Sequence, residues 1–221
     1  MIPKIIHHTN GQITPTVEDS RKSINRTHPD WEYKFWSDHD VKKLIKDSFS
    51  QYYDYWSLLP DSNIEKWNIA RYLIVAEHGG MYVDVDTLFY KNMNDVLDLT
   101  KSLIFIKKSG CAWIKDHFFL SSKRNPFWGH LMSDIIKAKN PNVHARVGGI
   151  RLNQSITAYS KQQKNSKEIQ YLNPNCVVNK DLQYEGKFKE FKPENVYVMH
   201  LVHGTWLRRA SKKDTYDKSG S

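Results

Sequence analysis

The sequence contains only two cysteines among its 221 residues, Cys111 and Cys176. They form neither a Cys-x-x-Cys pair nor a metal-binding spacing, which excludes a disulfide scaffold and indicates free thiols in a reducing compartment. The chain also lacks an apolar run near the ~20 residues that span a bilayer, and no secretory apolar segment follows Met1. We therefore expect no transmembrane segment, and a cytoplasmic protein of bacterial or viral origin or a fragment of a longer protein.

Internal repeats and Pro- or Ser-rich linkers are also missing from the sequence. With 39% hydrophobic and 13% aromatic residues, the composition predicts a folded globule. We expect one domain over residues 1–209 and a flexible tail over 210–221. The formal net charge of +9 is scattered rather than arranged in a stripe, so we expect no specific nucleic-acid partner. A solvated basic surface, attraction of an anionic donor, and weak binding to nucleic acid or an acidic membrane remain open.

Strands and helices are predicted to alternate along the chain. Apolar patterning favours strands at 2–8, 31–36, 103–106 and 196–202. A helix is predicted to start at a capping box made of Ser62 and Glu65 and to end at Gly79. This order predicts an α/β sandwich with a mostly parallel sheet and flanking helices, in which ligands bind beyond the carboxyl ends of the strands.

Residues 79–86, with the sequence Gly-Gly-Met-Tyr-Val-Asp-Val-Asp, form the most informative segment. As a strand, the segment would place Tyr82, Asp84 and Asp86 on one face. Two carboxylates whose Cα atoms lie roughly 7 Å apart can hold one divalent cation and leave room for diphosphate oxygens. The alternative is a surface strand with solvated acids.

Four segments in this order resemble the glycosyltransferases that carry the DXD sugar-binding signature, from the first strand to Trp206. These proteins include the initiating α-1,6-mannosyltransferases of yeast, bacterial capsular polysaccharide sugar transferases and the catalytic domain of the large clostridial glucosylating toxins. The segments are Ile2 to His7, Ala70-Arg71-Tyr72, residues 79–86, and His200-x-x-His203-Gly-Thr205-Trp206. The resemblance implies a GT-A fold, a nucleotide-sugar donor, Mn²⁺ or Mg²⁺, and retention of the anomeric configuration.

The resemblance also implies roles for individual residues. Asp86 would bind the metal directly, Asp84 would reach the metal and the ribose, and Arg71 would act with them in catalysis. His200 or His203 would be a further metal ligand, since Mn²⁺ accepts imidazole more readily than Mg²⁺ does. Further donor-binding residues would be His7, Thr9, Asn68, Gly80, Tyr82, Thr205 and Trp206. The family usually has Asp where this chain has Asn68.

One position departs from the family in a way that affects the nucleotide. The family often carries at Asn10 a tryptophan that stacks on the base, and Trp36 or Tyr33 are the aromatic residues that could replace it. We therefore predict a metal-dependent glycosyltransferase that moves a hexose or deoxyhexose from a UDP- or GDP-sugar to a hydroxyl of a glycan or glycoprotein. Two alternatives are a nucleotide-sugar hydrolase and a catalytically inactive polyanion-binding module on the same fold.

Overall fold

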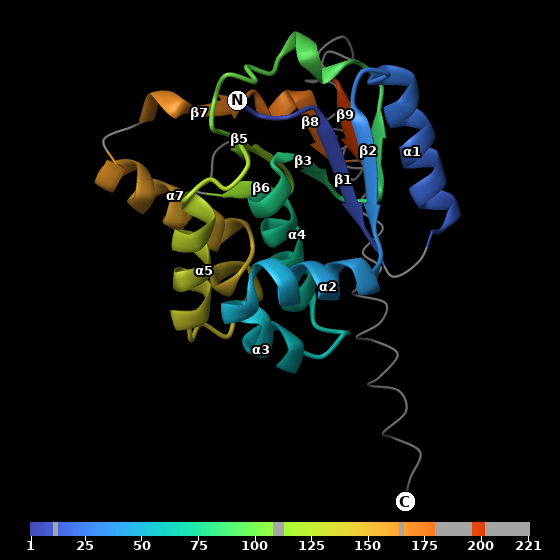
Figure 1. Ribbon diagram of the computed structural model, residues 1–221. Coiled ribbons are helices and arrows are strands. Elements are labelled where there is room, and N and C mark those ends of the chain that lie inside the picture. Colours follow the sequence, from blue (N-terminus) through green and yellow to red (C-terminus); the bar gives the residue numbers. More distant parts are fainter. Residues whose placement is uncertain (11–12, 108–112, 164–165, 180–195, 202–221) are drawn as a thin grey trace, which may run out of the picture.

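A computed structural model describes residues 1–10, 13–107, 113–163, 166–179 and 196–201 of the chain (Figure 1). Its main sheet has six strands in the order β2-β1-β3-β6-β5-β7. Only β6 runs against the other five strands, so the expected α/β fold with a mostly parallel sheet is confirmed. These strands are β1 (Ile5–Thr9), β2 (Glu32–Trp36), β3 (Gly80–Val83), β5 (Leu103–Lys107), β6 (Ile114–Ser121) and β7 (Ile169–Leu172).

A second, three-stranded sheet has the order β4-β9-β8, with β4 (Thr87–Phe89), β8 (Val177–Asn179) and β9 (Val198–His200). Seven α-helices occur in the described part of the chain, and none of them is long and apolar enough to cross a bilayer. The helices are α1 (Pro15–Thr27), α2 (Asp38–Ser48), α3 (Ser50–Leu58), α4 (Ile64–His78), α5 (Phe127–Lys137), α6 (Val143–Arg146) and α7 (Gly149–Gln163).

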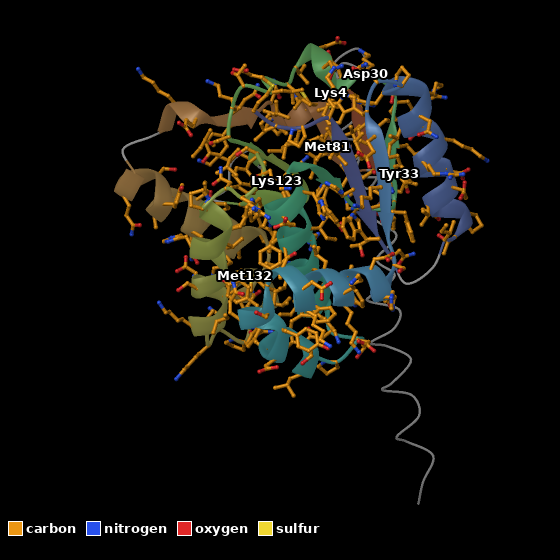
Figure 2. All side chains as sticks on the ribbon, in the orientation of Figure 1. Lys4, Asp30, Tyr33, Met81, Lys123 and Met132 are labelled. Carbon is orange, nitrogen blue, oxygen red and sulfur yellow. The ribbon has the colours of Figure 1, made fainter. Side chains whose placement is uncertain are left out.

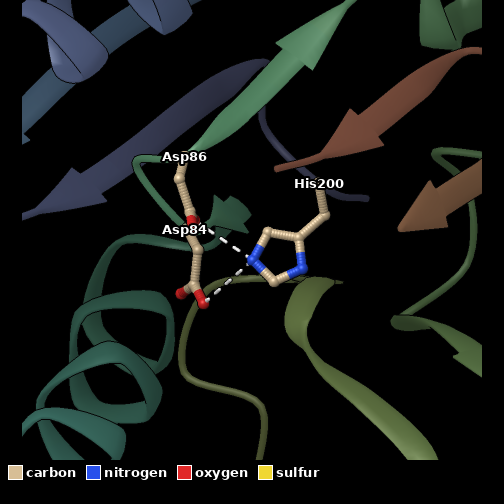
Figure 3. Close-up of side chains that lie close together, drawn as sticks. All are labelled: Asp84, Asp86 and His200. Atoms are coloured by element: carbon tan, nitrogen blue, oxygen red, sulfur yellow. Dashed lines mark hydrogen bonds and ion pairs between the residues drawn. The ribbon is translucent and has the colours of Figure 1, made fainter. Parts of the chain in front are cut away.

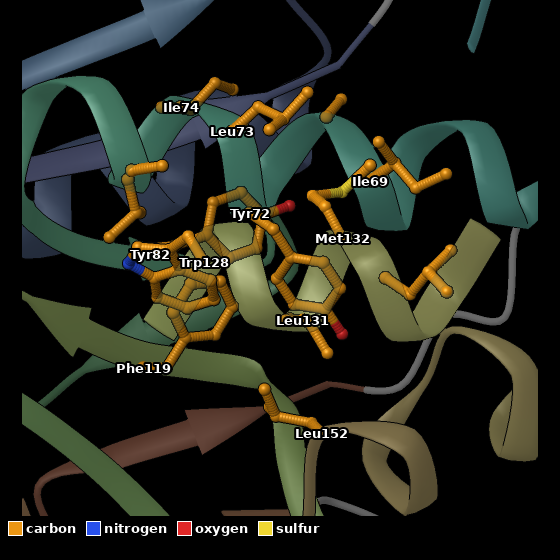
Figure 4. Close-up of a cluster of buried hydrophobic side chains, with 14 of the residues drawn as sticks. Ile69, Tyr72, Leu73, Ile74, Tyr82, Phe119, Trp128, Leu131, Met132 and Leu152 are labelled. Atoms are coloured by element: carbon orange, nitrogen blue, oxygen red, sulfur yellow. The ribbon is translucent and has the colours of Figure 1, made fainter. Parts of the chain in front are cut away.

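One face of the main sheet packs against the helices α4, α5 and α7, with α2 and α3 below them (Figure 1). Aromatic rings fill this core: Tyr72 of α4 stacks on Trp128 with 5.7 Å between ring centroids, and Tyr82 of β3 stacks on Phe119 at 5.4 Å (Figure 4). The Tyr72 hydroxyl donates a hydrogen bond of 2.9 Å to the carbonyl of Val147. These buried contacts fix α4 against the sheet and so fix the polar residues that α4 carries.

The other face of the main sheet packs against α1 and the second sheet. Ile6, Met81 and Val83 point into this core, where they meet Ile24 of α1 and Val198 of β9. Figure 2 shows Met81 beside β1 and β3, away from Met132 among the lower helices. Burial of this apolar surface holds the short strand β9 in place, and β9 ends at His200.

The turn from α4 into β3 requires two glycines. Gly79 and Gly80 have φ angles of 67° and 91°, in the region that side chains rarely adopt. A Cβ atom on Gly80 would lie 2.5 Å from the carbonyl oxygen of Ile5, so β3 can approach β1 closely only with glycine there. The prediction that α4 ends at Gly79 is confirmed.

The predicted cap of α4 is wrong by one residue. Asn63, not Ser62, is the N-cap, and its side-chain oxygen accepts a hydrogen bond of 2.9 Å from the backbone N–H of Glu65. A turn in which the Asn63 N–H donates to the carbonyl of Pro60 carries the chain one residue further before the helix begins. The Asn63 side chain then takes the capping role that asparagine fills well.

Candidate metal centre

The two aspartates of the DXD segment lie in a turn, not on a strand. β3 ends at Val83, so the prediction that Asp84 and Asp86 alternate along one strand face is wrong. The Asp84 N–H still donates to the carbonyl of His117 at 3.1 Å, but the Thr87 hydroxyl then donates to the carbonyl of Asp84 at 2.8 Å. This hydrogen bond closes the turn, and the turn brings both carboxylates to the carboxyl end of β3.

Asp84, Asp86 and His200 form a group whose ligand atoms all lie within 4.8 Å of one another (Figure 3). The Nε2 atom of His200 is 3.1 Å from Asp86 Oδ1 and 4.0 Å from Asp84 Oδ2. The pairing of β4 with β9 sets His200 opposite Thr87, and the N–H of Leu201 donates to the carbonyl of Asp86 at 2.7 Å. The sheet register therefore brings together residues that are more than a hundred positions apart in the sequence.

The charges in this group suit a cation. Desolvation raises the pKa of Asp84, and the charge of Asp86 adds to the rise although Arg71 opposes it. Burial lowers the pKa of His200, but the hydrogen bond to Asp86 and the charges of both aspartates outweigh burial and raise it above 6.5. Two carboxylates and an imidazole are donors that Mn²⁺ accepts, whereas Mg²⁺ prefers oxygen ligands, so the residues fit a divalent metal.

Arg71 lies next to this group and joins it to β6. Its side chain is 7% exposed, and Nη1 donates to Asp84 Oδ1 at 3.2 Å and to the carbonyl of Asp116 at 2.9 Å. A second ion pair joins Nη2 to Asp116 Oδ2 at 3.6 Å. Burial alone would lower the pKa of Arg71, but the two carboxylates raise it and keep the guanidinium charged. Sequence reasoning did not find Asp116, because no local pattern at the start of β6 marks it as an ion-pair partner.

Two more predicted donor-binding residues accompany Arg71 in this region. Tyr82 is 4% exposed, and the Arg71 guanidinium lies 5.6 Å from the centre of its ring. Burial raises the pKa of Tyr82, and neighbouring Asp84 adds to this rise. Asn68 precedes Arg71 by one helical turn and is 3% exposed, and its side-chain oxygen has no hydrogen-bond partner among the described residues. The two residues that the sequence placed three apart on one helix face, Asn68 and Arg71, both lie on α4.

The first strand, β1, carries two adjacent histidines with different hydrogen-bond partners. His7 is fully buried: Nε2 donates to the carbonyl of Gly79 at 2.8 Å, and Nδ1 accepts from the Trp36 indole N–H at 3.1 Å. Burial lowers the pKa of His7 to about 3. Both ring nitrogens of His7 and the indole N–H of Trp36 thus have hydrogen-bond partners within the protein.

His8, which is not among the predicted site residues, is the β1 histidine whose pKa is raised by the charge of Asp86 against the effect of burial. Its Nδ1 lies 3.1 Å from the Tyr33 hydroxyl, and its buried Nε2 has no hydrogen-bond partner in the described part of the chain. Burial lowers its pKa to about 3, and the charge of Asp86 partly opposes this. Thr9 donates from its hydroxyl to the carbonyl of Trp36 at 3.2 Å. The remaining predicted positions, His203, Thr205, Trp206 and the tail after 209, lie outside the described residues.

Comparison with known proteins shows which family and which fold the region around Asp84 and Asp86 resembles. Residues 14–103 match the family described as "Glycosyltransferase sugar-binding region containing DXD motif", a match that includes Arg71, Asp84 and Asp86. This segment of the chain is similar to the glycosyltransferases of that family. The solved structure of the PaToxG glycosyltransferase superposes with a TM-score of 0.59 at 18% identity, over 75% of this chain and 72% of that one. This likeness shows the fold, which is the GT-A glycosyltransferase fold.

Two relatives show how much of the chain the similarity covers. Inositol phosphoceramide mannosyltransferase 3 of Schizosaccharomyces pombe is 27% identical over 128 residues, which is 57% of this chain and 35% of the relative. An uncharacterized glycosyltransferase of Acanthamoeba polyphaga mimivirus is 24% identical over 219 residues, which is 93% of this chain and 84% of the relative. The chain matches only 35% to 52% of the length of the three fission-yeast mannosyltransferases.

Proposed function

We propose that this chain is a metal-dependent glycosyltransferase that moves a hexose or deoxyhexose from a UDP- or GDP-sugar to a hydroxyl of a glycan or glycoprotein, with retention. The observation that carries the proposal is the meeting of Asp84, Asp86 and His200 beside Arg71 within the matched sugar-binding region. The imidazole in this set favours Mn²⁺ over Mg²⁺. His203 is the alternative to His200 as the histidine ligand.

When bound, the metal would supply positive charge that stabilises the leaving nucleoside diphosphate. Arg71 orients the Asp84 carboxylate through its 3.2 Å ion pair and adds a second positive charge to the site. The Asn68 amide can bond a hydroxyl of the donor sugar, and its unpaired buried oxygen is available for that bond. Thr9, Gly80 and Tyr82 are proposed to line the donor site, and Thr205 and Trp206 to close over the diphosphate. In a retaining course, the acceptor hydroxyl attacks on the face from which the diphosphate leaves, and a diphosphate oxygen takes its proton.

The names of the relatives guide the choice of donor. The fission-yeast relatives are named as inositol phosphoceramide mannosyltransferases, so mannose is the first hexose to test and GDP-mannose the first donor. A glycolipid hydroxyl joins glycan and glycoprotein hydroxyls among the acceptors to test. Release of free sugar that does not depend on an acceptor would instead identify a nucleotide-sugar hydrolase.

The test is a thermal-shift series with UDP, GDP, CMP and dTDP, each with Mn²⁺ and with EDTA. We expect one base class to raise the melting temperature only with Mn²⁺, because the metal joins the diphosphate to the protein. Asp86→Ala should abolish this shift, and Asp54→Ala, which removes an exposed acid on α3, should keep it. Absence of any metal-dependent shift in the wild type would reject the proposal, and steeply salt-dependent binding of RNA or DNA would support a polyanion-binding module.

A further inference from the structure

One half-buried histidine beside the metal centre has no part in the mechanism above. His117 of β6 stacks on His200 with 4.1 Å between ring centroids and 20° between ring planes. Of the ring pairs within the described residues, this one has the shortest separation between centroids. A nearly parallel stack at this distance fixes the plane of the ring that it covers.

The backbone of His117 is tied to the same centre. Val83 pairs with Phe118 at the end of the β3–β6 ladder, and the next hydrogen bond runs from the Asp84 N–H to the His117 carbonyl. His117 therefore contacts one candidate ligand through its backbone and another through its ring. Both contacts come from the long strand β6, which lies between β3 and β5 in the sheet.

His200 lacks the support that metal-binding histidines normally have. In most metal sites the ring nitrogen that does not bind the metal donates a hydrogen bond, and this bond sets the orientation of the ring. The Nδ1 atom of His200 is buried and has no hydrogen-bond partner among the described residues. Besides the contact of Nε2 with Asp86, the face of His117 is the contact that the structure provides to hold the ring plane.

We propose that His117 is a positioning residue of the metal centre, whose ring face holds the His200 imidazole with Nε2 directed at Asp84 and Asp86. This inference rests on the proposed function, because it concerns the same metal. His117 is not assigned as a ligand: the described residues whose ligand atoms converge are Asp84, Asp86 and His200. Its effect is exerted through His200.

The test compares Mn²⁺ affinity, measured by calorimetry without nucleotide, in two variants. His117→Leu fills the site with an apolar side chain but removes the flat ring, and we expect about 10- to 100-fold weaker binding, as for other outer-sphere partners. His117→Phe keeps a flat ring without nitrogen and should bind Mn²⁺ within the same order of magnitude as the wild type. If His117 only supported the fold, His117→Leu would have a lower melting temperature in EDTA, but His117→Leu and His117→Phe would bind Mn²⁺ with similar affinity.

Spectroscopy distinguishes positioning from coordination even if His117→Leu does not fold. Electron spin echo modulation of bound Mn²⁺ should show the same imidazole nitrogen coupling in the wild type and in His117→Phe. Fewer coupled nitrogens in His117→Phe, or equally weak binding by both variants, would make His117 a ligand and overturn the proposal. Wild-type affinity in His117→Leu would also overturn it. If Asp86→Ala abolishes Mn²⁺ binding while His117→Leu leaves it unchanged, only the role proposed for His117 is rejected. If the wild type binds no Mn²⁺, the assignment of the metal centre is rejected as well.

Discussion

Substitution of Arg71 by methionine tests the electrostatic account of the site. Methionine keeps much of the length and apolar surface of the side chain but removes the charge that pairs with Asp84 at 3.2 Å and with Asp116 at 3.6 Å. Breaking a buried ion pair costs about 3–5 kcal/mol. Because the side chains of Asp84 and Asp116 are 30% and 18% exposed, solvent screens part of this cost, and we expect about 2–3 kcal/mol.

For a chain of this size, that loss corresponds to a fall in melting temperature of about 4–12 °C in EDTA. Mn²⁺ should restore more stability to Arg71→Met than it adds to the wild type, since a cation no longer meets a neighbouring guanidinium and replaces its charge. Differential scanning calorimetry with EDTA and with Mn²⁺ measures both effects. The matched control is Arg124→Met, which removes an exposed pair with Glu77 and should cost less than about 1 kcal/mol. The reasoning would be refuted if Arg71→Met and Arg124→Met had equal melting temperatures in EDTA. It would also be refuted if Mn²⁺ raised the melting temperature of Arg71→Met by less than that of the wild type.

Two further predictions concern pH and the backbone. The pKa of His200 in the folded protein is raised above 6.5, so its pairing with Asp86 stabilises the metal-free protein below pH 6.5. This stabilisation is lost as the pH rises through the raised pKa. The Mn²⁺ affinity should change in the opposite sense and fall as the pH drops through that pKa, because a protonated imidazole cannot bind the metal. Calorimetric titrations across this range check both slopes, and a pH-independent Mn²⁺ affinity would remove His200 from the site. Gly80→Ala should destabilise the fold by a few kcal/mol, because the added Cβ would lie 2.5 Å from the Ile5 carbonyl oxygen. The control is Gly129→Ala, whose added Cβ would meet nothing within 4 Å, and it should be neutral or stabilising. Equal melting temperatures for the two variants would contradict this prediction.

The sequence allowed the fold class to be predicted because its strands and helices alternate and Gly79-Gly80 mark the end of α4. It also pointed to the two carboxylates through their spacing, and the resemblance to the DXD glycosyltransferases pointed to His200 or His203. The local geometry could not be predicted in the same way: alternation continued through residue 86 in the sequence, but a turn stabilised by Thr87 ends the strand three residues earlier.

The partners supplied by distant strands were not predictable from local patterns. His117 and Asp116 sit at the polar start of β6, and which of them meets His200 or Arg71 depends on the β3–β6 register. Which of His7 and His8 has partners for both ring nitrogens depends likewise on which side of β1 faces α4, and two adjacent histidines carry no signal that separates them. Tertiary packing decides both cases.

The most direct test of the central claim is an anomalous difference map at the manganese absorption edge, from crystals grown with Mn²⁺ and either UDP or GDP. The account predicts a peak about 2.0–2.4 Å from oxygens of Asp84 and Asp86 and from Nε2 of His200, in the range of hard divalent cations in proteins. Anomalous density away from these three side chains, or none with either nucleotide, would contradict the assignment of this group as the metal centre.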